Sequence, residues 1–98
     1  MSVRKGGVLI AGNPVFRSEV FTVQPQDWDQ DTKTVELTFQ GLTASSEILV
    51  SAAPDNLQNI KDFARFFIYG SGVSTNTVTL TCENIPTVQI KVIVGLLR

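Results

Sequence analysis

The stretch 77-TVTLTCE-83 alternates between threonine and a less polar side chain. Successive side chains of a β-strand point to opposite faces of the sheet, so Val78, Leu80 and Cys82 share one face and the threonines share the other. This pattern is typical of a strand with one dry and one wet face. Cys82 has no second cysteine to pair with, and its phase predicts a small buried side chain.

Beyond Pro86, residues 87–97 continue the alternation, with Val88, Ile90, Val92 and Val94 on one face. The opposite face is polar except for Ile93, and 95-GLL-97 follows. An apolar residue on the wet side indicates that this last strand is covered on both faces near its end. We therefore predict that association between copies of the chain buries three residues here: Ile93, Leu96 and Leu97.

Three more strands are predicted before residue 77. Residues 33–40 alternate with their apolar side chains in phase, residues 47–53 do the same, and residues 19–24 form a shorter run. Pro25 and Pro54 end two of these runs, because proline has no N–H to donate to a β-ladder.

Between residues 55 and 67 the apolar period lengthens to three and four residues, which predicts a helix. Its expected core stripe is Leu57, Ile60, Phe63, Ala64 and Phe67. Phe66 lies about 100° from Phe67 on such a helix, so we expect it to be an exposed interface aromatic. The glycines of 70-GSG-72 are interpreted as a turn.

The predicted fold is mainly β, an antiparallel β-sandwich of about six to seven strands with one short inserted helix. The 98 residues form one domain, with an N-terminal arm at residues 1–18 and the sandwich at residues 19–98. Small and apolar residues around Val8, Leu9 and Ile10 suit an arm that adds a strand to a neighbouring subunit, the alternative being a frayed terminus.

Charge is scarce and balanced, with 17% charged residues and a net charge of -1. Soluble domains average about 25% charged residues, so we expect part of the surface to be buried in an assembly. The basic residues are scattered and do not form a stripe for nucleic acid. No apolar run has the length of a membrane span or a signal peptide, which predicts a soluble protein made in a cytoplasm.

The residues needed for common catalytic sites are missing. Without histidine and with one cysteine, the chain has no Ser-His-Asp or Cys-His arrangement and no cysteine-based zinc site. We expect no enzyme activity and no cofactor. The remaining enzymatic alternative is a pair of aspartates with separated pKa values.

Those aspartates lie in 26-QDWDQDTK-33, where Asp27, Asp29 and Asp31 surround Trp28, the single tryptophan. A calcium loop of the EF-hand type needs glycine at its sixth position and a glutamate at its twelfth, and here both positions hold threonine. We interpret the segment as a polar loop with aspartates as turn formers and Trp28 as a lid over the core. A bound cation, or a sugar or peptide platform on Trp28, remains an alternative.

The order of landmarks resembles a small domain found in structural proteins of tailed phages and prophages. The resemblance is carried by Trp28 before a strand, then VELTFQGLTASSEILVSAAP at residues 35–54, a short helix, and NTVTLTCENIPTVQIKVIV at residues 76–94. It covers roughly residues 20–95.

The resemblance implies a virion protein of the tail-fibre, baseplate or head-fibre kind, made in the bacterial host. Its expected partners are copies of itself, with a trimer favoured, and other virion proteins. The alternative is a carbohydrate-binding module, or a module for a glycan receptor, built from Asp27, Trp28, Asp29, Asp31 and Tyr69.

Overall fold

The computed structural model describes residues 17–97, and these form a mainly β structure with one α-helix. The six strands are β1 (Arg17–Val23), β2 (Thr34–Thr38), β3 (Ile48–Ala52), β4 (Tyr69–Ser74), β5 (Thr77–Thr81) and β6 (Ile90–Leu96). Helix α1 (Leu57–Arg65) lies between β3 and β4, and a 3₁₀ turn (Pro25–Asp27) follows β1. The prediction of a mainly β fold with one inserted helix is confirmed, and the strand count is six.

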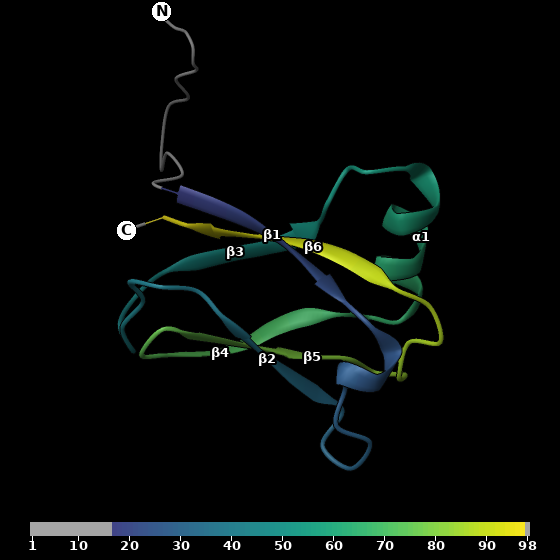
Figure 1. Ribbon diagram of the computed structural model, residues 1–98, viewed down its shortest axis with the longest axis horizontal. Helices are drawn as coiled ribbons and strands as arrows, with labels where there is room; N and C mark the ends of the chain where they lie inside the picture. The colour runs from purple at the N-terminus through teal and green to yellow at the C-terminus, as the bar shows by residue number, and fades with distance from the viewer. Residues whose placement is uncertain (1–16, 98) are drawn as a thin grey trace, which may run out of the picture.

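The strands form two three-stranded antiparallel sheets, in the orders β1-β6-β3 and β2-β5-β4. Figure 1 shows them as two layers, with α1 at one end. In the first sheet β6 is central, and Ile93 lies between Val20 of β1 and Ser51 of β3. The first and last described strands of the chain are therefore neighbours.

The alternation in the sequence predicted the buried side chains of both sheets. Val78, Leu80 and Cys82 are buried, and so are Val35, Leu37 and Phe39. These residues belong to one hydrophobic cluster with Val23 and with the inward side chains of β6. The wet and dry faces of the strands are thus as expected from the sequence.

Strand β6 is shorter than the predicted run and more buried at its end. It begins at Ile90, and Val88 lies exposed before it. Leu96 is 9% exposed in the single chain, so the expectation that it needs a neighbouring copy to be buried is wrong. The physical reason is that β6 stays regular through Gly95, which leaves Leu96 in the same inward phase as Ile90, Val92 and Val94. Leu97 and Ile93 are half-buried.

Helix α1 buries a different face from the predicted stripe. Leu57, Ile60 and Phe67 are exposed, whereas Asn59 and Asp62 are buried. Phe63 packs against the core from the same side of the helix. The rotation of α1 is set by hydrogen bonds from Asn59 to the end of the first sheet, which hydrophobic periodicity does not register.

The 70-GSG-72 segment is part of strand β4 and not a turn. The register of β4 against β5 shifts between Gly70 and Gly72, as in a β-bulge. The reversal lies after the strand, at Thr75 and Asn76, where Asn76 has a φ of 56°. Asparagine is among the residues that tolerate this left-handed conformation, and the bulge explains why the glycines resembled a turn.

Candidate functional site

The aspartates of the loop after β1 form hydrogen bonds within the loop itself. The carboxylate of Asp27 accepts the backbone N–H of Gln24 at 2.8 Å. One carboxylate oxygen of Asp29 accepts the backbone N–H groups of Asp31 at 2.8 Å and Thr32 at 2.9 Å. The interpretation of these two aspartates as turn formers is confirmed.

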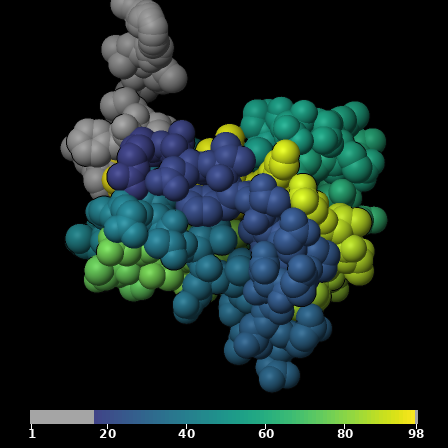
Figure 2. All heavy atoms as spheres, viewed as in Figure 1, coloured from purple at the N-terminus to yellow at the C-terminus, as the bar shows by residue number. Residues whose placement is uncertain are grey.

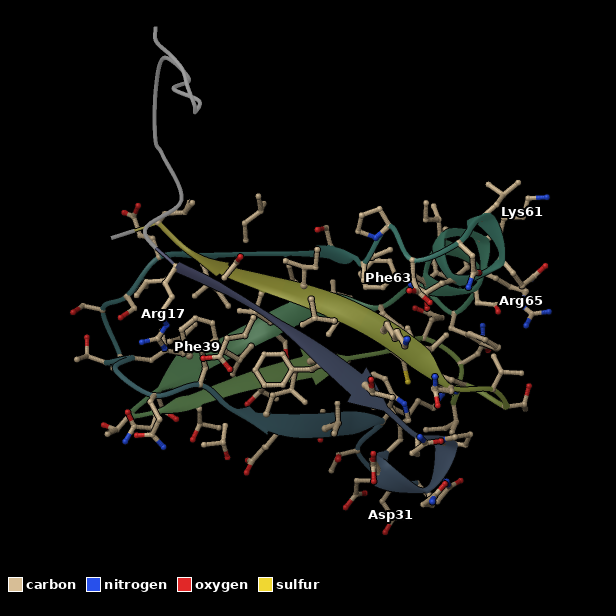
Figure 3. All side chains as sticks on the ribbon, turned by 45° about the horizontal axis from the view of Figure 1, so that its top comes forward. Arg17, Asp31, Phe39, Lys61, Phe63 and Arg65 are labelled. Carbon is tan, nitrogen blue, oxygen red and sulfur yellow. The ribbon has the colours of Figure 1, made fainter. Side chains whose placement is uncertain are left out.

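Those hydrogen bonds also act on the titration of Asp29. The backbone N–H of Thr32, followed by that of Asp31, holds the pKa of Asp29 below its ordinary value of 3.8. Asp31 points away from the body of the molecule (Figure 3). In the part of the chain that the structure describes, no three acidic, cysteine or histidine side chains gather into a metal-binding group.

Trp28 is buried beside this loop, and only 3% of its surface is exposed. This confirms the prediction that it packs on the core, and it contradicts a platform on which a sugar stacks against the indole. Its Nε1–H has no hydrogen-bond partner among residues 17–97. Tyr69, the other aromatic of the carbohydrate alternative, is exposed on β4, which is separated from β2 by β5.

A shallow, open depression lies next to the loop, and sequence reasoning missed it. It joins two segments that are far apart in the chain: Pro25, Gln26, Gln30, Ile85, Pro86 and Thr87. None of these side chains ionises near neutral pH, so the depression is lined by no side chain of the kind that usually acts as a general acid or base. Only the tertiary arrangement brings these segments together.

Phe66 and Phe67, which follow α1, differ from the prediction in their exposure: Phe66 is buried and Phe67 is exposed. Phe66 is 8% exposed, so the prediction that it faces solvent is wrong. The guanidinium of Arg65 lies 4.5 Å from the centre of its ring. Phe67 is instead 63% exposed, because its φ of 52° ends the helix in the left-handed conformation and turns its side chain outward.

The outward face of the β1-β6-β3 sheet carries an apolar patch, which it shares with the polar residues Ser18, Thr22, Ser51 and Lys91. Val20 on β1 is 60% exposed and Leu49 on β3 is 57% exposed. Ile93 lies between these strands on β6, directly opposite Val20, and is half-buried. Among the predicted interface residues that the structure describes, Ile93 lies within this exposed apolar patch.

The outward face of the other sheet has the opposite character. Its central strand β5 presents Thr77, Thr79 and Thr81, out of phase with the buried Val78 and Leu80. The flanking β2 presents Thr34, Glu36 and Thr38. Threonine hydroxyl groups form hydrogen bonds with water, so burial of this face against a partner would gain less free energy than burial of the apolar patch.

Cys82 is a structural residue of the core. Its thiol is buried, and burial raises the pKa of Cys82. A raised pKa leaves little thiolate at neutral pH, which makes Cys82 a poor nucleophile.

Comparisons with protein-family models, curated proteins and solved structures found no match for this chain. Among the described residues, no helix has the length and apolar character needed to cross a membrane. The predicted arm residues Val8, Leu9 and Ile10 lie outside the residues that the structure describes.

Proposed function

We propose that this chain is a non-enzymatic structural or assembly protein that acts by binding copies of itself and other subunits. The observation that carries the proposal is the contrast between the two outward sheet faces. One face exposes Val20 and Leu49 beside Ile93, and the other is rich in threonine. An apolar face of this kind is stabilised by a partner that removes it from water.

Burial of this apolar patch supplies part of the free energy of association. Full burial of an aliphatic side chain contributes about 1.5–3 kcal/mol. Val20 and Leu49 contribute most, since both are more than half exposed in the single chain. Because association also costs rotational and translational freedom, backbone hydrogen bonds or further contacts must add to it.

The two sheets are best described as a β-sandwich within this proposal. Their inward side chains share one cluster, and the rings of Phe21 and Phe39 lie 6.3 Å apart between β1 and the end of β2. Arg17 on β1 lies with its guanidinium 4.3 Å from the ring centre of Phe39 (Figure 3). A sandwich leaves one outward face on each sheet, and we place subunit contacts at the β1-β6-β3 sheet, which carries the exposed Val20 and Leu49.

We further propose that the assembly is a phage or prophage virion, as a fibre, baseplate or decoration component. This part depends on the resemblance of residues 20–95, which implies other virion proteins as partners.

Self-association is tested by sedimentation of the full chain at micromolar concentration. We expect a mass that is a multiple of a single chain. A single-chain mass at every concentration contradicts self-association.

Membership of a virion needs a separate experiment. Phage particles from a strain carrying the gene are purified on a density gradient and probed with an antibody to the chain. We expect the chain in the particle fraction at constant stoichiometry. Its absence from particles contradicts the virion assignment and leaves self-association standing.

A further inference from the structure

Strand β1 has a free edge along its whole described length. The backbone N–H and C=O of Lys91 on β6 bond toward β3, because its C=O accepts from Ala53 and its N–H donates to Asn59. Backbone groups of an antiparallel strand alternate in direction, so those of Ile90 and Val92 point toward β1. The residues of β1 paired with them, Val23 and Phe21, therefore point toward β6.

By the same alternation, Ser18, Val20 and Thr22 direct their N–H and C=O groups away from β6. Within residues 17–97, β1 pairs with no other strand, and these groups have no backbone partner outside the sheet. In Figure 2 the purple atoms of β1 lie at the surface, and no other coloured segment covers them in this view.

The other three sheet edges differ from that of β1. Strand β3 is shorter, with five residues against seven, and β4 lies close to it, since a Cβ atom placed on Gly70 would be only 2.9 Å from Cγ2 of Val50. Strand β4 carries the bulge between Gly70 and Gly72, which disrupts pairing with a further strand. At β2, Asp29 donates its N–H to the C=O of Thr34, and the middle residue is the charged Glu36.

Strand β1 has fewer protective features, because its two charged residues, Arg17 and Glu19, lie in its first half. Its register against β6 is regular, and it contains no proline or lysine. Its middle residue is Val20, which is apolar and exposed. A regular, exposed edge of seven residues is a template for another strand.

We propose that two copies of this chain pair through β1, antiparallel, with the two-fold axis at Val20. This rests on the proposed self-association and names its surface and its partner. Val20 of one copy lies opposite Val20 of the other, and Ser18 lies opposite Thr22. Every outward N–H of one strand then meets an outward C=O of the other.

Side chains favour the same register. Glu19 falls opposite Phe21 of the second copy, so no like charges stand directly opposite each other. On the outward face, Val20 and Ile93 of one copy continue into Val20 and Ile93 of the other. A pair through β2 would instead bring two Glu36 side chains together, which is unfavourable.

The first test compares Val20→Lys with Leu49→Lys in the full chain. Both residues are exposed and apolar, on the same face of the same sheet, but only Val20 lies on the pairing edge. We expect a two-chain mass for the wild type, and a dissociation constant at least about 100-fold weaker for Val20→Lys, from the loss of two buried valines. Leu49→Lys should remain a dimer, and circular dichroism checks that both variants fold.

The outcomes separate this inference from the proposed function. A trimer, or a dimer unaffected by Val20→Lys, overturns pairing through β1 but leaves self-association intact. If Val20→Lys and Leu49→Lys weaken association equally, the contact lies on the outward face of the sheet, and pairing through β1 is again overturned. A wild-type chain that stays monomeric contradicts both the pairing through β1 and the proposed self-association.

A second test uses a cross-link and does not depend on weakening the dimer. Paired residues on antiparallel strands have Cα atoms about 5.5 Å apart, within reach of a disulfide. We expect Val20→Cys to form disulfide-linked dimers on mild oxidation, whereas Leu49→Cys does not. The native Cys82 is buried and serves as an internal control. Failure of Val20→Cys to cross-link in a dimeric protein overturns the pairing.

Discussion

Asn59 joins α1 to the first sheet through its side-chain amide. In a regular ladder Ala53 and Lys91 would exchange two backbone hydrogen bonds, but only the bond from Ala53 N–H to Lys91 C=O forms. The amide of Asn59 replaces the other: it accepts from Lys91 N–H at 2.8 Å and donates to Ala53 C=O at 2.8 Å. Both polar atoms of the buried Asn59 side chain therefore have hydrogen-bond partners.

Replacement of Asn59 by alanine should lower the free energy of unfolding by about 2 kcal/mol, because buried backbone groups lose their partner. Urea denaturation followed by circular dichroism measures this change. Lys61→Ala, an exposed position of the same helix, is the control and should change stability by less than about 0.5 kcal/mol. Equal effects at both positions would show that the amide bridge does not stabilise the fold.

Asp29 makes the turn after β1 sensitive to acid. Its pKa is lowered in the folded chain by backbone N–H donors, so its contribution to stability is complete above 3.8 and is lost as the pH falls below that value through the folded pKa. We expect Asp29→Asn to be less stable than the wild type at neutral pH. This difference should shrink progressively as the pH falls below 3.8.

The matched control for Asp29 is Asp31→Asn, which removes one charge from the same loop. The carboxylate of Asp31 accepts no hydrogen bond from residues 17–97 in this structure, whereas that of Asp29 accepts two from backbone N–H groups. Urea midpoints measured across the acid range compare the three proteins. If both variants show the same pH dependence, the effect comes from loop charge in general and not from the turn of Asp29.

At the scale of single elements, β4 shows how packing selects glycine inside a strand. Gly70 lies against Val50 of the facing sheet, and Gly72 lies beside Thr79 of the neighbouring strand. A Cβ atom on Gly70 would be 2.9 Å from Val50 Cγ2, whereas one on Gly72 would be 3.8 Å from the nearest atom, the Cβ of Thr79. The first distance forces a shift, and the second is an ordinary contact.

Gly70→Ala should therefore destabilise the protein by about 1–3 kcal/mol, the usual cost of overpacking. Gly72→Ala adds the same methyl group two residues away and should change stability by less than about 0.5 kcal/mol. Thermal unfolding of the two variants measures both values. A Gly70→Ala variant as stable as Gly72→Ala would mean that β3 and β4 do not approach as closely as described.

The same element shows where sequence patterns lose information. Alternation predicted β2 and β5, because their inward and outward residues differ in polarity. Strand β4 has no such contrast, since glycine and serine occupy most of it. Helix α1 was predicted in its extent but not in its orientation, because Asn59 and Asp62 face inward and Leu57 and Ile60 face solvent.

At the scale of the whole molecule, the two sheets differ in what they expose. The β1-β6-β3 sheet carries the exposed apolar side chains Val20 and Leu49 on its outward face, and the β2-β5-β4 sheet carries threonines. This asymmetry depends on β6 joining β1 and β3, which lie far from it in the chain. The edge of β1 that we assign to self-association, with Ile93 of β6 beside Val20, thus exists only in the folded chain.

The amino-acid sequence by itself determined which residues of β2 and β5, and of β6 as far as Val94, are buried, and that Asp27 and Asp29 form turns. Side-chain alternation and aspartate-to-backbone hydrogen bonds are local properties, so they can be read from a few consecutive residues. The tertiary structure decided the order of strands, the face of α1, the burial of Phe66 and Leu96, and the free edge of β1. Each of these depends on contacts between segments far apart in the chain, where a single hydrogen-bonded amide or a close approach at glycine outweighs local preference.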